Sequence, residues 1–174
     1  MHYEPEFENI TLKDSEYFYR LMQMYARELD DHQNRKTNPD ALRSWTYRIV
    51  EKQNNEKRPI YLKFCCVRST VIGFFYGDTD KPDDKGFAKP GYGCIMEFYV
   101  LPEYRRQGYG KKMFLYLLNM FRKDGIKKLY LTADPITGKP FWEALGFTAT
   151  GEICPDNNQS VYEMKLSDDV NSKR

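Results

Sequence analysis

The stretch Arg105-Arg106-Gln107-Gly108-Tyr109-Gly110 lies between an apolar run with strand composition and a second apolar run with helical period. The first N–H groups of a helix have no partner within the helix, and they carry partial positive charge. Because Gly108 and Gly110 lack a Cβ, a phosphate group can come close to the backbone here. The stretch therefore predicts an anion site at the start of a helix, and its two arginines would attract a polyanion.

Three other glycine loops fit this stretch less well. A Walker A loop needs a glycine well ahead of its Gly-Lys pair and a Ser or Thr after it, but Arg105 and Lys112 stand there. A Rossmann fingerprint needs a third glycine at the position of Met113. An RNA-recognition motif lies in a strand, whereas the residues after Gly110 have helical period. The pattern that remains is Arg/Gln-x-x-Gly-x-Gly.

With this loop, the chain resembles the GCN5-related N-acetyltransferase (GNAT) family. The resemblance covers residues 95–104 and the loop after them, and it resumes at Phe141-Trp142-Glu143-Ala144-Leu145-Gly146-Phe147. Two motifs in the usual order are more specific than one glycine loop. The resemblance implies an α/β fold: a GNAT-like mixed sheet with helices on both faces and a splay between two central parallel strands. These strands would be residues 92–101 and 128–133.

Periodicity along the chain predicts the element order β-α-α-β-β-β-α-β-α-β-β, which suits that fold. Helix starts are marked by capping residues and prolines, such as Asp14-Ser15 and Asn38-Pro39. The predicted strands are residues 7–12, 60–67, 71–76, 92–101, 128–133, 147–153 and 159–166. The predicted helices are residues 15–31, 39–53, 111–121 and 140–145, and 78–91 is expected to be a loop.

Composition excludes several classes of protein. The chain has 174 residues, 41% of them hydrophobic, which suits one domain at 1–166 with a disordered tail at 167–174. A net charge of +2 argues against a nucleic-acid binder. No apolar run approaches the roughly 20 residues of a membrane span, and the first residues have no signal-peptide pattern. Because the four cysteines include no Cys-x-x-Cys pair, we expect a reduced, cytoplasmic protein. The histidines His2 and His32 are far from both motifs in sequence, so no metal site is expected.

The resemblance implies that acetyl-CoA binds in the splay as a cosubstrate. Its pantetheine arm would pair with the backbone of Phe98, Tyr99 and Val100 as an added half-strand does. Its pyrophosphate would lie on backbone N–H groups from Arg106 to Lys111. The residues expected to bind acetyl-CoA are Phe98, Tyr99, Val100, Arg105, Arg106, Gln107, Gly108, Tyr109, Gly110 and Lys111.

Glu97 is the candidate catalytic residue, because it is a carboxylate in an otherwise apolar strand directly before the segment expected to bind pantetheine. A carboxylate there can attract a cationic amine or pass its proton on through water. Strand alternation would place Glu97 on one face with Ile95 and Tyr99, and Met96, Phe98 and Val100 on the other.

Trp142 departs from the family pattern. The second motif of the family often has a tyrosine here, which protonates the departing thiolate, and an indole N–H cannot do so near neutral pH. The usual upstream asparagine is also missing, and Asp134-Pro135 occupies that region. The thiolate could leave unaided, or another group could protonate it; the candidates are Tyr92, Cys94, Tyr99 and Tyr162.

The sequence therefore predicts transfer of an acetyl group to a primary amine of a small molecule or peptide, by direct attack in a ternary complex. A non-catalytic acyl-CoA sensor stays open as the alternative, because of Trp142. Acidic residues in 28–38 and 78–91 hint at a cationic acceptor, although ordinary solvated charge explains them as well. Dimers are common in the family, so a homodimer is also an open alternative.

Overall fold

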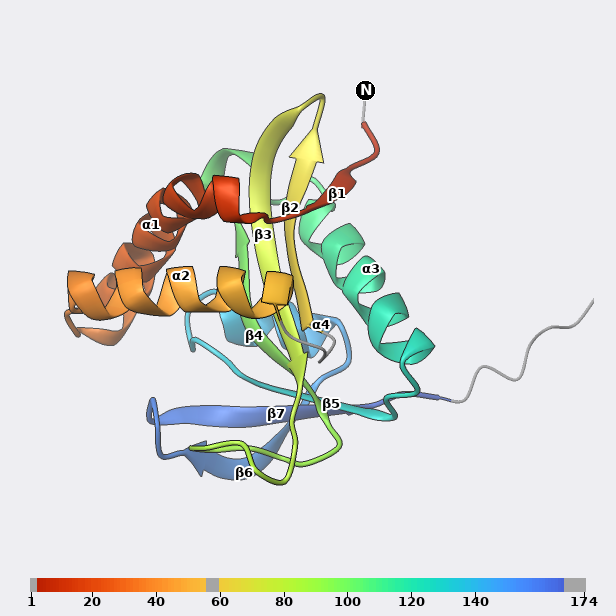
Figure 1. The fold of residues 1–174 in the computed structure, drawn as a ribbon. Helices are drawn as coiled ribbons and strands as arrows, with labels where there is room; N and C mark the ends of the chain where they lie inside the picture. The colour runs from red at the N-terminus through yellow and green to blue at the C-terminus, as the bar shows by residue number, and fades with distance from the viewer. Residues whose placement is uncertain (1–2, 56–59, 168–174) are drawn as a thin grey trace, which may run out of the picture.

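The fold, seen in a computed structural model, is a seven-stranded mixed sheet with helices on both faces (Figure 1). The structure describes residues 3–55 and 60–167, so the predicted tail lies, from residue 168 on, outside the described residues. The strands are β1 (Glu6–Asn9), β2 (Ile60–Val67), β3 (Thr70–Thr79), β4 (Gly93–Val100), β5 (Lys128–Thr132), β6 (Thr148–Cys154) and β7 (Gln159–Lys165). The helices are α1 (Ser15–Gln33), α2 (Pro39–Asn55), α3 (Tyr109–Lys123) and α4 (Gly138–Ala144).

The predicted order of elements is confirmed, with two differences at strand ends. The first strand stops at Asn9, because Leu12–Asp14 forms a 3-10 turn in which Asp14 accepts hydrogen bonds from the backbone and hydroxyl of Thr11. The strand β3 continues three residues beyond its predicted end, to Thr79, because that end pairs with the start of β4.

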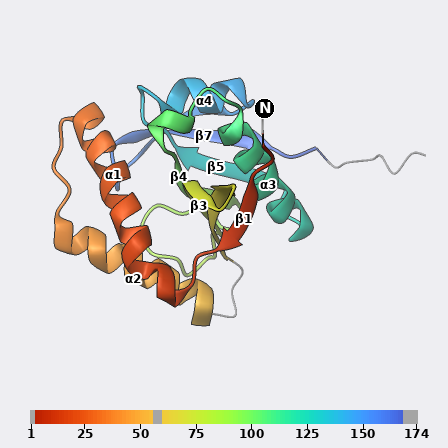
Figure 2. The same ribbon diagram turned by 90° about the horizontal axis from the view of Figure 1, so that it is seen from above.

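The strand order is β1-β2-β3-β4-β5-β7-β6, and two hydrophobic cores lie on its two faces. Figure 2 shows α1 and α2 on one side of the sheet and α3 and α4 on the other. On the first side, Phe18 packs edge-on against Phe74 with ring centroids 5.0 Å apart. On the second side, α3 buries Met113, Leu117 and Phe121 completely. Burial of a side chain of this size contributes about 1.5–3 kcal/mol, so the buried side chains on both faces stabilise the packing of the helices against the sheet.

The two central parallel strands separate, as the resemblance implies. Within the described residues, β4 and β5 pair only at Gly93 with Leu129 and at Cys94 with Tyr130. Beyond Cys94, β4 pairs with β3 alone, so its other backbone edge faces the gap. Figure 1 shows the result: β2, β3 and β4 run upright, whereas β5 and β7 run across them.

A β-bulge interrupts β4 where the two strands separate. Tyr76 pairs with Glu97 and the next residue of β3 pairs with Ile95, so Met96 is an extra residue without an opposite partner. The bulge changes the predicted alternation of side chains, because an extra residue moves each side chain after it to the opposite face of the sheet. Ile95 packs in the α3 core, whereas Glu97 and Tyr99 face α1 and α2. The prediction that all three share one face was therefore wrong.

Candidate active site

A cleft of about 610 Å³ lies where β4 and β5 diverge. The helix α1 forms one wall, α4 forms another, and the loop before α3 lies at its mouth. Most residues expected to bind the cofactor line this cleft: Phe98, Tyr99, Val100, Arg105, Arg106, Gly108, Gly110 and Lys111. Gln107 and Tyr109 do not; Gln107 donates a hydrogen bond to the carbonyl of Glu103, and Tyr109 is 5% exposed in the α3 core.

The loop before α3 has the conformation of a helix N-terminal anion site. Gly108 is the N-cap with φ of 85°, a left-handed conformation that favours glycine, and Arg106 is also left-handed. The N–H of Lys112 donates to the carbonyl of Gly108, so the N–H groups of the three helical residues before it precede the first helical hydrogen bond. A Cβ on Gly110 would lie 3.1 Å from the Phe141 ring, so a larger residue fits there only with a small shift of that ring.

The side chain of Arg105 forms its hydrogen bonds within the protein. Its two terminal nitrogens donate to the two carboxylate oxygens of Glu28 at 2.9 and 2.7 Å, and its Nε donates to the carbonyl of Val100 at 2.8 Å. The hydrogen bond with Glu28 raises the pKa of Arg105 above its ordinary value. Arg105 therefore ties α1 to β4 across the cleft mouth, in a bidentate geometry that is among the stronger ion-pair types.

A small chamber of about 90 Å³ continues from the cleft into the gap between β4 and β5. The cleft and the chamber share Tyr25 and Leu29 of α1, Phe98 of β4 and Trp142 of α4. Met96, the bulge residue, lines the chamber on the β4 side. The chamber is thus the inner end of the cleft, where a group carried on an extended arm would arrive.

Glu97 lies beside this chamber, half-buried under α1 and α2. The indole N–H of Trp45 donates to its Oε1 at 3.3 Å, and the Tyr25 hydroxyl donates to it as well. Burial raises the pKa of Glu97 to about 7, although hydrogen bonds from Trp45 and Tyr25 act to lower it. A carboxyl with a pKa near neutrality can accept a proton at working pH and release it again.

Comparison with known proteins identifies the family. The sequence model of the acetyltransferase (GNAT) family matches residues 18–147. The chain belongs to the GNAT acetyltransferase family. A comparison with curated protein sequences found no match.

Solved structures show the same acetyltransferase fold. The PaiA N-acetyltransferase of Thermoplasma acidophilum, solved in complex with coenzyme A, is 18% identical with a TM-score of 0.69, covering 94% of this chain and 99% of that one. A GNAT acetyltransferase from Staphylococcus aureus is 14% identical with a TM-score of 0.73, covering 94% and 100%. A predicted acetyltransferase from Clostridium acetobutylicum, solved with acetyl-CoA, is 21% identical with a TM-score of 0.67, covering 86% and 93%.

Trp142 of this acetyltransferase is a core residue that also forms a wall of the cleft. It is 6% exposed, and its ring centroid lies 5.0 Å from that of Phe98, 4.8 Å from Phe141 and 5.4 Å from Phe147. Edge-to-face packing of this kind adds to the gain from burial. The tryptophan therefore fixes α4 against β4, next to the segment where the resemblance expects the pantetheine arm.

The alternative proton donors predicted from the sequence lie outside the chamber. Burial raises the pKa of the Cys94 thiol, which packs beside Tyr130, and the Tyr162 hydroxyl lies 3.4 Å from Glu143. Tyr99 and Tyr92 also do not line the chamber. The tyrosine that does line it is Tyr25, and burial, followed by the charge of Glu97, raises its pKa well above the ordinary value.

Sequence reasoning missed Tyr25 and Trp45, the two donors to Glu97. Both belong to α1 and α2, where their only signal is ordinary helical spacing of aromatic residues. His32 of α1 lies near the start of α4, because its Nδ1 is 3.2 Å from Asp134 Oδ2. That aspartate accepts further hydrogen bonds from the backbone and hydroxyl of Thr137, so it holds the start of α4.

Two classes of site are not found in the described part of the chain. No group of three or more His, Cys, Asp or Glu side chains there could hold a metal ion. None of the helices in residues 3–55 and 60–167 is long and apolar enough to span a membrane.

Proposed function

We propose that the protein transfers the acetyl group of acetyl-CoA to a primary amine of a small molecule or peptide, by direct attack in a ternary complex. The observation that carries the proposal is Glu97, a carboxyl with a pKa of about 7 beside the inner end of the cleft. Family membership supports the use of acyl-CoA, and relatives of the same fold were solved with coenzyme A and with acetyl-CoA.

The cosubstrate fits the residues that form the cleft. The free edge of β4 at Phe98, Tyr99 and Val100 can hydrogen-bond an extended arm as a strand would, although Arg105 already occupies the carbonyl of Val100. The backbone N–H groups from Arg106 to Lys111 can hold the pyrophosphate, with the exposed Lys111 ammonium nearby. When bound, acetyl-CoA supplies an acetyl group on a reactive thioester.

Glu97 acts on the acceptor amine. An ammonium group cannot attack a carbonyl carbon, so the amine must lose a proton, and Glu97 takes it directly or through water. The amine nitrogen then forms the new bond to the acetyl carbon as the bond from that carbon to the sulfur breaks. Holding the two reactants together at the chamber contributes much of the rate gain, because it removes the entropic cost of their encounter.

The sulfur leaves without help from Trp142. A thiol has a pKa of about 8.5, so a thiolate is already a fairly good leaving group at neutral pH. Tyr25 lines the chamber and donates to Glu97, so its hydroxyl can pass the captured proton on to the sulfur. This route places the first proton that Glu97 removes from the amine on the free thiol of CoA, and the nitrogen loses its second proton to Glu97, which releases it to water.

Thermal denaturation with acetyl-CoA, CoA and unrelated nucleotides tests the cosubstrate. A ligand present at 100 times its Kd adds about 2.7 kcal/mol to stability, so selective stabilisation by acetyl-CoA is expected. Release of CoA with a panel of amines then tests catalysis. Stabilisation without release from any amine would favour the sensor alternative, and the lack of any shift at millimolar acetyl-CoA would remove both.

A further inference from the structure

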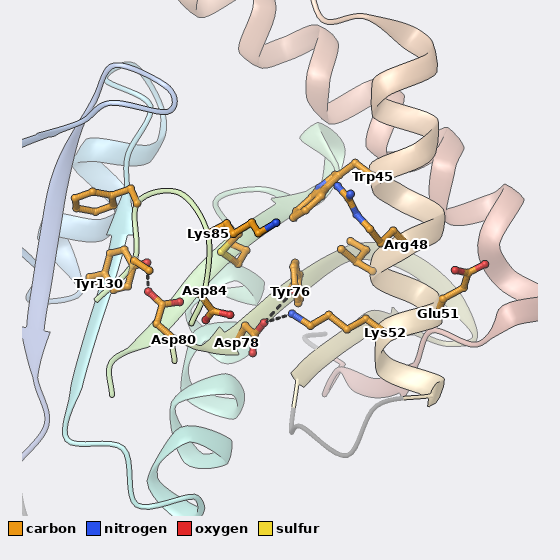
Figure 3. A pocket seen from close by; sticks show the side chains of 14 residues that line it. Trp45, Arg48, Glu51, Lys52, Tyr76, Asp78, Asp80, Asp84, Lys85 and Tyr130 are labelled. Carbon is orange, nitrogen blue, oxygen red and sulfur yellow. Dashed lines mark hydrogen bonds and ion pairs between the residues drawn. The ribbon is translucent and has the colours of Figure 1, made fainter. Parts of the chain in front are cut away.

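A second pocket, of about 550 Å³, lies between α2 and the loop that joins β3 to β4 (Figure 3). We call it the α2 pocket; Trp45, Arg48, Asp78, Lys85 and Met96 are among its lining residues. Met96 also lines the chamber, and Trp45 donates to Glu97. The cofactor cleft, the chamber and the α2 pocket therefore follow one another, with Glu97 near the junction of the last two.

This order matters for the reaction. An amine must reach the acetyl carbon while the cosubstrate fills the cleft, so it needs its own approach to the chamber. The α2 pocket offers that approach from the far side of the β4 bulge, past Met96, whose side chain is 39% exposed. The inference below rests on the acetyl transfer proposed above.

Four acids line the α2 pocket, and the two buried ones, Asp78 and Asp80, are already engaged. Asp78 accepts from the Lys52 ammonium at 2.7 Å and from the Tyr76 hydroxyl at 3.2 Å. Asp80 accepts from the Tyr130 hydroxyl and from the N–H of Lys89. Both carboxylates are more than nine-tenths buried, so they hold the β3–β4 loop in place. These two carboxylates are therefore not available to bind a cationic acceptor.

The basic residues at the mouth of the pocket have a different environment. Arg48 and Lys85 are exposed, and neither forms an ion pair with any residue that the structure describes. The Arg48 guanidinium lies 5.3 Å from the centroid of the Trp45 ring. Figure 3 shows Lys85 pointing toward the same ring from the loop side, while Glu51 points away. The mouth of the pocket thus offers two cations without an ion-pair partner among the described residues and an aromatic wall, while Asp84, which also lines the pocket, accepts a hydrogen bond from the N–H of Lys81.

We propose that the α2 pocket binds the acceptor, and that the acceptor is a primary amine carrying an anionic group, a carboxylate or a phosphate. Arg48 and Lys85 hold the anionic group, since a guanidinium fork and an ammonium both suit these oxyanions. The apolar part of the acceptor lies on Trp45, and the amine reaches past Met96 to Glu97.

Matched acceptor pairs test this assignment in an assay of CoA release by the full-length protein. Phenylalanine is compared with phenethylamine, O-phosphoethanolamine with ethanolamine, and spermidine serves as a polycation. We expect at least one anionic amine to have a kcat/KM at least tenfold above its neutral partner and above spermidine. The double variant Arg48→Gln/Lys85→Gln should reduce that ratio at least tenfold, mainly through KM.

The control is Lys13→Gln/Lys81→Gln, which removes the same charge at exposed positions outside the pocket. It should leave the ratio unchanged, which separates local binding from long-range attraction. Preference for spermidine or for the neutral amines would overturn the acceptor class but leave acetyl transfer intact. An equal loss of activity with all acceptors in the Arg48/Lys85 variant would also overturn it. Release of CoA with none of the amines would overturn the acetyl transfer as well.

Discussion

Replacing Glu97 with glutamine should remove activity and stabilise the fold at the same time. Glutamine has nearly the shape of the protonated carboxyl, and its Oε1 can still accept from Trp45, but it takes up no proton from an amine. We therefore expect turnover to fall at least tenfold at pH 8, with little change in affinity for acetyl-CoA. A buried carboxylate that lowers the stability of the fold when ionised is typical of a residue needed for activity.

The size of the stability effect follows from the pKa. Burial raises the pKa of Glu97 from 4.5 to about 7, so the folded state binds a proton more tightly than the unfolded state does. The stability due to this proton is complete below the unfolded pKa and is lost as pH rises through the folded one. At pH 8 the ionised carboxylate then destabilises the fold by about 3 kcal/mol, at 1.36 kcal/mol per pKa unit. At pH 5 the loss is below about 1 kcal/mol.

Urea denaturation of the wild type and the Glu97→Gln variant at pH 5, 6, 7 and 8 measures this difference. The variant should gain stability steadily across the series, and Glu8→Gln, at an exposed position of the edge strand β1, should gain none. Equal stability differences at pH 5 and pH 8 would show that the carboxyl is not desolvated. Unchanged turnover with a good acceptor would refute its role as the base.

Three further predictions concern the groups around the cleft. Trp45→Phe removes a hydrogen bond that lowers the pKa of Glu97, so the midpoint of the pH–kcat/KM profile should move above 7. An unchanged midpoint would exclude Trp45 as a partner of the base. Gly110→Glu should leave a folded protein whose affinity for CoA is reduced at least a hundredfold, because a side chain and a negative charge enter the anion site. Normal binding of CoA in calorimetry would show that the loop has only a structural role. Arg105→Gln should lower stability by about 2 kcal/mol by releasing α1, and its effect should not add to that of Glu28→Gln, since both remove one ion pair.

The sequence was sufficient to predict the order of helices and strands because the signals for that order are local. Capping residues, helical period and the Gly108 turn each depend on a few neighbouring positions, and all of them agree with one element order. The family resemblance then supplied the strand arrangement, including the splay, which no local pattern shows. Strand ends were less predictable, because β3 continues only through its pairing with β4.

The site was only partly predictable, because its decisive features depend on contacts between distant segments. The bulge at Met96 leaves no mark in the composition of the strand, yet it decides which face Glu97 occupies. The commitment of Arg105 to Glu28 joins residues 77 positions apart, so a motif could show the arginine but not its partner. The raised pKa of Glu97 likewise needs the burial that α1 and α2 impose.

The tryptophan at position 142 limits which protein groups can donate or accept a proton during the reaction. Trp142 supplies no proton near neutral pH, and the tyrosine that lines the chamber, Tyr25, has a pKa far above neutrality. Tyr25 can relay a proton, but Glu97 is the carboxyl beside the chamber whose pKa lies near 7. A second titrating acid would impose a falling limb on the pH–rate profile, whereas a base acting alone leaves activity rising through about 7 to a plateau. In the proposed mechanism, the tryptophan at the position of the family tyrosine leaves Glu97 as the group whose titration the pH–rate profile should report.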